Sequence, residues 1–332
     1  MAEMEADETA HRESQSVRDE PAGAGATRRR ALLLVNARSR RAADVLDDLV
    51  ARLRDIRDLD VVIGACDDAE ALSDTIVAHR DRVDMVVVGG GDGTVNAAAR
   101  GLVETGLPLA LIPLGTANDL ARTLAIPEDL DGALAIVRAG RTRAIDIGQV
   151  NDRHFFNVAS IGLSVALARA LTPDLKKRFG RLGYLVALLK ILVRARPFRA
   201  RIEAPDWRVR VRTLQIAVGN GLYYGGGMEV AAGATIDNGT LDLYSLEVGS
   251  VWKLLLMAPA FRAGRHGTWK EVRTVEATGF TVSTRRPRPV NADGEIITYT
   301  PATFRILPKA VRVFAPPGAP GLTLQEPDET SP

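Results

Sequence analysis

Residues 86–96 read Val-Val-Val-Gly-Gly-Gly-Asp-Gly-Thr-Val-Asn, so an apolar, β-branched run passes directly into a glycine-rich turn. This order predicts a buried strand, a tight turn and the first residues of a helix. Glycines let the backbone approach a ligand closely, and the free amides and dipole at a helix start form an anion site. The turn therefore predicts phosphate binding, with tight packing of strand against helix as the alternative.

Two common phosphate-binding signatures do not fit this turn. No Lys follows the glycines as it does in a Walker A loop, and the third glycine of a dinucleotide fingerprint is missing. Asp92 would repel a bare phosphate, which indicates that Mg²⁺ accompanies a nucleotide here.

A second polar turn, Pro-Leu-Gly-Thr-Ala-Asn-Asp at 113–119, follows the next apolar strand along the chain. The carboxyl ends of parallel strands collect at one edge of a sheet, where ligands of such sheets bind. We therefore expect the two turns to face each other across one crevice. A plain helix N-cap at Asn118 or Asp119 is the alternative interpretation.

The alternation of short apolar runs with helical stripes extends on both sides of these turns. Over residues 31–140 it predicts a doubly wound parallel α/β sheet that forms a nucleotide-binding domain. Over residues 141–315, alternating segments bounded by Gly, Asn-Gly or Pro predict an antiparallel, β-rich second domain. The polar flanks, residues 1–30 and 316–332, are expected to be disordered tails.

Composition fits a globular protein, because 46% of the 332 residues are apolar and 25% are charged. A net charge of +2 excludes a uniformly basic nucleic-acid coat, and a single cysteine excludes an internal disulfide framework. The longest nearly apolar run, residues 182–193, is shorter than the ~20 residues that span a bilayer. No signal peptide is evident, and a cytoplasmic location is expected.

The two turns together resemble those of the diacylglycerol kinase catalytic family, specifically its soluble bacterial lipid kinases, and the resemblance covers residues 31–315. It implies that the first turn binds the phosphates of ATP and that the second also contacts the nucleotide. The residues so implicated are Gly90, Gly91, Asp92, Gly93, Thr94, Val95, Asn96 and Thr116. Sphingosine and ceramide kinases share this resemblance, whereas NAD kinases and phosphofructokinases share only the first turn.

Residues 291–295, Asn-Ala-Asp-Gly-Glu, have two interpretations. An Asp-Gly pair between strands is a frequent hairpin turn. The resemblance instead implies that the catalytic acid lies here, with Glu295 preferred and Asp293 close behind. Such a base takes the proton of a lipid hydroxyl while the γ-phosphate is transferred.

The loop at 235–240, Thr-Ile-Asp-Asn-Gly-Thr, is also a hairpin signal by composition. In the kinases that this sequence resembles, the matching loop holds a structural Mg²⁺ through one Asp side chain and flanking carbonyls. The resemblance therefore implies Thr235, Asn238 and Thr240 as ligands. Asn238 stands where the family has Asp, which weakens the site, and Asp237 is a candidate substitute ligand.

A basic segment lies between residues 176 and 212, where twelve Lys or Arg outnumber two acids. An apolar stripe from Leu182 to Val193 predicts a core-packing helix with a solvated basic side. The alternative is a surface that docks on anionic lipid. The lack of interleaved aromatic residues argues against nucleic acid as the partner.

These observations predict an ATP-dependent lipid kinase with a nucleotide domain at 31–140 and a lipid-substrate domain at 141–315. The expected acceptor is a hydroxyl of diacylglycerol or a related lipid, which gives a phosphatidic-acid-type product. The expected cofactors are ATP and Mg²⁺. The expected partner is a lipid substrate at the anionic inner face of the membrane, and a homodimer is left open. The alternatives are a sphingoid-base kinase, an NAD kinase-like enzyme and a non-catalytic nucleotide- or lipid-binding homologue.

Overall fold

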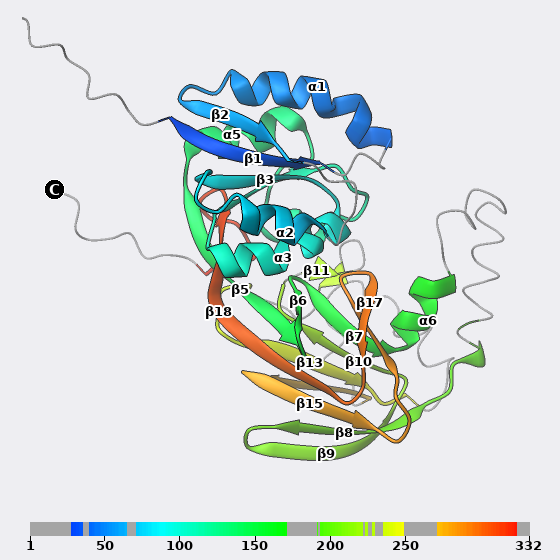
Figure 1. Ribbon diagram of the computed structural model, residues 1–332. Coiled ribbons are helices and arrows are strands. Elements are labelled where there is room, and N and C mark those ends of the chain that lie inside the picture. The colour runs from blue at the N-terminus through cyan, green and yellow to red at the C-terminus, as the bar shows by residue number, and fades with distance from the viewer. Residues whose placement is uncertain are drawn as a thin grey trace, which may run out of the picture.

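A computed structural model describes residues 28–35, 40–64, 71–170, 191, 193–221, 223–224, 228–229, 235–248 and 271–323. Its strands form two large sheets. One runs from the helix-flanked upper part of the molecule into the strand-rich lower part, and the other consists only of strands of the C-terminal part (Figure 1).

The N-terminal part is the doubly wound parallel sheet that the sequence predicts. Its four parallel strands lie in the order β2-β1-β3-β4. They are β1 (Arg29–Val35), β2 (Leu59–Ile63), β3 (Met85–Gly90) and β4 (Leu109–Pro113). The helices that connect and follow them are α1 (Arg40–Arg54), α2 (Ala71–Ala78), α3 (Asp92–Thr105), α4 (Asp119–Thr123) and α5 (Leu130–Ala139). The apolar residues of β1, β3 and β4 are buried because they lie between layers of helices.

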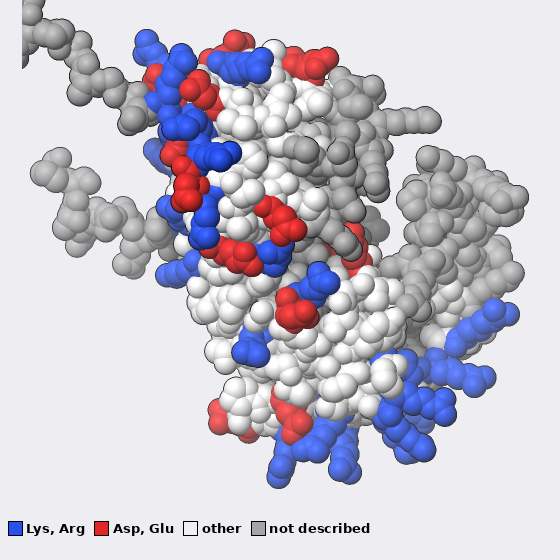
Figure 2. All heavy atoms as spheres, in the orientation of Figure 1, with Lys and Arg blue, Asp and Glu red and all other residues white. Residues whose placement is uncertain are grey.

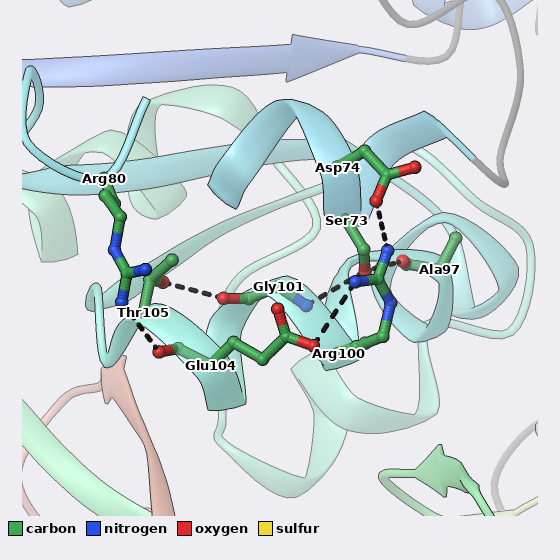
Figure 3. A network of polar contacts seen from close by, with 8 residues as sticks. All are labelled: Ser73, Asp74, Arg80, Ala97, Arg100, Gly101, Glu104 and Thr105. Carbon is green, nitrogen blue, oxygen red and sulfur yellow. Dashed lines mark hydrogen bonds and ion pairs between the residues drawn. The ribbon is translucent and has the colours of Figure 1, made fainter. Parts of the chain in front are cut away.

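Helix α3, which begins at the glycine-rich turn, is held against α2 by a polar network (Figure 3). The Ser73 hydroxyl donates to the carbonyl of Ala97 at 2.7 Å and accepts from the amide of Gly101 at 3.0 Å. Arg100 forms ion pairs with Asp74 of α2 and with Glu104 one turn further along α3. These bonds fix the axis of α3, and with it the position of the turn at its start.

The C-terminal part is antiparallel and β-rich, as predicted. One sheet has the order β14-β13-β10-β7-β16-β17. Its strands are β7 (Val158–Gly162), β10 (Gln215–Gly219), β13 (Leu241–Leu246), β14 (Val272–Ala277), β16 (Pro289–Ala292) and β17 (Glu295–Tyr299). Helix α6 (Leu163–Ala170) follows β7, and the short strands β11 (Tyr223–Tyr224) and β12 (Met228–Glu229) pair with each other.

The first sheet continues into this C-terminal part, so a single ten-stranded sheet serves both halves of the molecule. The link is the long strand β18 (Ala302–Phe314), which pairs in parallel with β4 and antiparallel with β5 and β15. The remaining strands are β5 (Thr142–Val150), β6 (Arg153–Phe155), β8 (Phe198–Ala204), β9 (Trp207–Thr213) and β15 (Gly279–Thr284). Side chains of both sheets meet in one apolar core, which makes the C-terminal part a β-sandwich.

The chain remains packed beyond the boundary at residue 315 that the sequence predicts. Ala319 and Leu322 are buried in the core of the N-terminal part. The amide of Gly321 donates to the carbonyl of Thr123 at 3.0 Å, and its own carbonyl accepts from Ile236 at 2.8 Å. The predicted tail boundaries are therefore corrected, since Ala319, Gly321 and Leu322 are packed and β1 already begins at Arg29.

Candidate functional site

The glycine-rich turn leaves the first turn of α3 open on its outer side. Gly91 is the N-cap, in an extended conformation, and no side chain caps the helix. The amides of Thr94 and Val95 both bond to the carbonyl of Gly91, at 3.0 and 3.1 Å. An uncapped helix start of this kind has amides and a positive dipole end available for an anion.

The second polar turn lies directly against the first, as predicted. A Cβ on Gly115 would lie 2.4 Å from the Cα of Gly91, so Gly115 excludes any side chain, and a Cβ on Gly91 would lie only 3.0 Å from the Cα of Gly115. The amide of Leu114 donates to the carbonyl of Gly90 at 3.0 Å. The space that remains between the turns is only about 10 Å³. A phosphate would therefore bind over the two turns and not in a crevice between them.

Asn118 stands at the N-cap position of α4, but its side chain forms no capping bond and braces the second turn instead. Its side-chain oxygen accepts from the amide of Gly115 at 3.0 Å, and its side-chain nitrogen donates to the carbonyl of Gly115 at 3.2 Å. The residue has a left-handed φ of 50° and is buried. Thr116, by contrast, is exposed at the tip of the turn, where its hydroxyl can reach a ligand.

The residues that the resemblance assigns to ATP binding differ in exposure and in the hydrogen-bonding groups that are free to contact a phosphate. Val95 points into the hydrophobic core and its amide is taken by the helix, so it cannot contact a phosphate directly. Thr94 is buried as well. The side-chain oxygen of Asn96 is buried and has no hydrogen-bond partner among the described residues. Gly91, Asp92 and Gly93 are partly exposed and form the accessible surface of the turn.

The structure brings Glu295 to this same turn from the opposite end of the chain. It is the first residue of β17, and Asp293-Gly294 links β16 to β17 with both φ angles positive, at 46° and 99°, as in a type I′ hairpin. Glu295 is exposed, and its Oε1 lies 3.4 Å from the position that a Cβ on Gly93 would occupy. A carboxylate therefore stands over the uncapped start of α3.

Asp293 is placed differently from Glu295. Its Oδ2 accepts from the amide of Phe156 at 2.7 Å, and its Oδ1 accepts from the amides of Asn157 and Val158, both at 3.1 Å. Burial raises the pKa of Asp293 to about 6, the three amide bonds oppose that shift, and the charge of Asp92 adds to it. Backbone amides bond to both oxygens of Asp293, which favours a role in positioning the hairpin over the expected catalytic role.

Removal of this carboxylate should loosen the hairpin that carries Glu295. We expect Asp293→Gly, which retains the left-handed backbone, to cost about 1–3 kcal/mol of unfolding free energy at pH 4 because three amides lose their acceptor. The loss of unfolding free energy should be smaller at pH 7 than at pH 4. Because the pKa of Asp293 is higher in the folded state, its carboxyl stabilises the fold fully below the unfolded pKa of 3.8. That stabilisation is lost as pH rises through the folded pKa of about 6. Urea unfolding at pH 4 and pH 7 measures both effects.

Lys309→Gly is the matched control for this substitution. Lys309 also has a left-handed φ, of 51°, and its side chain is exposed. The change in unfolding free energy of Lys309→Gly therefore measures the effect of placing glycine at a left-handed position, without the loss of a buried carboxylate. Equal losses in the two variants, at either pH, would show that the Asp293 carboxylate does not hold the hairpin.

The loop expected to bind a structural Mg²⁺ does not fit that ion. The side-chain oxygen of Asn238 accepts from the amide of Thr240 at 3.1 Å. The Asp237 side chain is only 5% exposed, pairs with Arg143 at 3.3 Å and accepts from the amide and hydroxyl of Thr323. Among the described residues, no group of three His, Cys, Asp or Glu is arranged to hold a metal. Thr235, Asn238 and Thr240 thus lack the free carboxylate that Mg²⁺ requires of such a loop.

Part of the basic segment predicted from sequence lies outside the described residues, namely 176–190 and 192. In the described part of the chain, every helix is too short or too polar to cross a membrane.

Comparison with known proteins agrees with both halves of the structure. The model of the diacylglycerol kinase catalytic domain matches residues 30–150, and that of the YegS C-terminal NAD kinase beta sandwich-like domain matches residues 157–315. A "Probable lipid kinase YegS-like" protein of Klebsiella pneumoniae (strain 342) is 32% identical over 72% of this chain and 80% of its own. One of the same name from Pseudomonas syringae pv. syringae (strain B728a) is 30% identical over 89% of this chain and 96% of its own.

A solved structure shows the same fold. The crystal structure of a diacylglycerol kinase from Bacillus anthracis str. Sterne superposes with a TM-score of 0.67, over 88% of this chain and 98% of that one. At 22% identity, this likeness concerns the fold.

Proposed function

Since the chain belongs to the YegS-like lipid kinases, with their diacylglycerol kinase catalytic domain and C-terminal β-sandwich, we propose that it phosphorylates a hydroxyl of diacylglycerol. The chain is a kinase, and its relatives are named lipid kinases. The identity of the acceptor and the roles of individual residues are what we propose.

The observation that carries this proposal is the position of Glu295 beside Gly93. Phosphoryl transfer requires a site for the phosphates of ATP, neutralisation of their charge, and a base for the attacking hydroxyl. The open start of α3 supplies the first requirement, and the magnesium that enters with ATP supplies much of the second. The carboxylate of Glu295 supplies the third, since it is exposed and lies beside the start of α3, next to the position proposed for the γ-phosphate.

The proposed step uses few protein groups. The lipid hydroxyl oxygen attacks the γ-phosphorus while its proton passes to a carboxylate oxygen of Glu295. The bond from the γ-phosphorus to the bridging oxygen breaks, and ADP leaves with that oxygen. A phosphorylated lipid remains, and Glu295 returns the proton to water. Asp293 acts through the backbone, by holding the hairpin that aims Glu295 at the turn.

The test is transfer of label from γ-labelled ATP to a set of acceptors dispersed in neutral detergent micelles. The set contains diacylglycerol, a sphingoid base, NAD and a total lipid extract. We expect label in the phosphatidic acid formed from diacylglycerol. Label in NAD or in the sphingoid base, with none in phosphatidic acid, would replace the proposed acceptor.

A further inference from the structure

An arginine-rich surface covers the end of the β-sandwich that is far from the nucleotide turn. Figure 2 shows basic side chains gathered at the bottom of the molecule, over β8 and β9, whereas basic and acidic side chains alternate around the N-terminal part. We call this surface the arginine face. Its members are Arg199, Arg201, Arg208, Arg210, Arg212 and Arg285, all of which are exposed.

Strand pairing sets the like charges of this face directly against one another. In the register of β8 and β9, Arg199 lies opposite Arg212 and Arg201 lies opposite Arg210. Like charges at directly opposed positions destabilise an antiparallel pair. The sheet therefore carries a repulsion that two Ser or Thr residues at these positions would avoid.

The face contains little acid to offset its charge. Glu203 pairs with Arg201 at 2.7 Å. Within the described part of the chain, Arg199, Arg210 and Arg212 form no ion pair. Arginines from both strands and Arg285, which follows β15, line a shallow hollow of about 580 Å³, together with Ser283 and Thr284. This arrangement of guanidinium groups and hydroxyls suits phosphate oxygens, which guanidinium binds in a bidentate manner.

An apolar hollow beside the face indicates what carries those phosphates. It measures about 420 Å³ and is lined in part by Leu163, Ala166, Phe198 and Leu214. Arg194, Arg196 and Arg288 lie at the same hollow, and the Arg288 guanidinium stacks 4.1 Å from the centre of the Phe198 ring. Val193, which precedes Arg194 in the sequence, is 73% exposed. Apolar surface next to a cationic face matches a bilayer surface better than nucleic acid or polyphosphate, which offer no apolar part.

We propose that the arginine face docks this protein on the phosphate headgroups of an anionic bilayer. The inference rests on the proposed function, because a kinase of membrane lipids must work where its acceptor resides. It also explains the repulsion across β8 and β9, since anionic headgroups neutralise both members of each arginine pair. Screening weakens such docking as ionic strength rises.

Binding of the full chain to vesicles, measured by flotation without ATP, tests this proposal. The vesicles contain phosphatidylcholine alone or mixed with phosphatidylglycerol. We expect binding only to the mixed vesicles, and a loss on the order of a hundredfold for the triple variant Arg199→Gln, Arg210→Gln, Arg212→Gln. The triple variant should unfold at the same urea concentration as the parent or a higher one, because the opposed charges are removed.

The matched control is Arg54→Gln, Arg57→Gln, Arg138→Gln, which removes the same charge from exposed positions of the N-terminal part. It should bind mixed vesicles like the parent. Equal losses in the two triple variants, equal binding to neutral vesicles, or preference for duplex RNA over mixed vesicles at the same salt would each overturn the proposal.

Activity on diacylglycerol in neutral micelles separates this proposal from the proposed function. We expect the arginine variant to retain the micellar rate and to lose rate on mixed vesicles. If the parent labels none of the lipids but still binds mixed vesicles through the arginine face, the docking stands and the acceptor is wrong. If it labels diacylglycerol in both settings and the arginine variant does so equally, the docking is wrong and the function stands.

Discussion

Replacement of Glu295 by Gln should lower kcat by about 10²–10⁴-fold, the usual contribution of a general base. Gln has the size of Glu and leaves the β16–β17 hairpin and the glycine turn unchanged, but it cannot accept the proton of the attacking hydroxyl. The KM for ATP should change little, because the carboxylate acts on the transferring proton and not on nucleotide binding. Initial rates with micellar diacylglycerol, together with ATP binding by calorimetry, measure both quantities.

Glu104→Gln is the control for this substitution. Glu104 is also exposed and lies near the other end of α3, paired with Arg100. It should retain full activity. A Glu295→Gln variant that is as active as Glu104→Gln would remove Glu295 from the chemistry and leave only nucleotide binding at this site.

Substitution of Gly93 by Val should abolish most of the ATP affinity while the protein remains folded. Among the described residues other than its chain neighbours and the backbone of its own helix, a Cβ at this position would meet only Oε1 of Glu295 within 4 Å, at 3.4 Å. The backbone of Gly93 does not have a positive φ, so a β-branched residue is tolerated in the first turn of α3. Its methyl groups would cover the amides that face the phosphates, and the loss of one or two charge-assisted bonds weakens binding by about ten- to a thousandfold.

Gly93→Ala provides an internal comparison, since its single methyl group should weaken ATP binding less than Val does. Calorimetric titration with ATP and Mg²⁺, and unfolding midpoints for both variants, give the measurement. Gly115→Val, in contrast, should fail to fold, because its Cβ would overlap the backbone of Gly91. Unchanged ATP affinity in a folded Gly93→Val variant would exclude the glycine turn as the phosphate site.

The nucleotide half of the site could be predicted from sequence because its signals are local. A strand, four glycines and a helix start follow one another within residues 86–96, and the second turn follows the next strand. Parallel strands then place both turns at one edge of the sheet, and the contact between Gly91 and Gly115 confirms that expectation. Local pattern did not show that Val95 points into the core, because the direction of a helix face depends on the packing around it.

The part of the site that the C-terminal β-sandwich contributes depends on contacts between segments far apart in the chain, and a single sequence does not reveal such contacts. The role of Asp293 follows from the amides of residues 156–158, which only the pairing of β7 with β16 brings near. The same holds for Asp237, whose partners Arg143 and Thr323 lie far away along the chain. Glu295 itself was identified by family resemblance, since Asp-Gly-Glu is an ordinary hairpin pattern by composition.

The local sequence pattern also could not predict how the chain passes between the two domains. The sequence predicts a boundary near residue 140, but strand β18 returns to β4 and adds its apolar residues to the core of the N-terminal part. The arginine face is similar, because the opposition of Arg199 and Arg212 depends on the register of a hairpin whose turn the sequence does not fix.

The central claim is that Glu295 and the glycine turn form a single phosphoryl-transfer site. The most direct test is a crystal structure with a non-hydrolysable ATP analogue and Mg²⁺. The account predicts that the terminal phosphate lies on the exposed amides at the start of α3. The Glu295 carboxylate should lie on the side of that phosphate opposite the bridging oxygen, where a hydroxyl would approach within hydrogen-bond reach of it or through one water. Phosphates bound away from Gly93, or a Glu295 carboxylate turned away from the terminal phosphate, would contradict it.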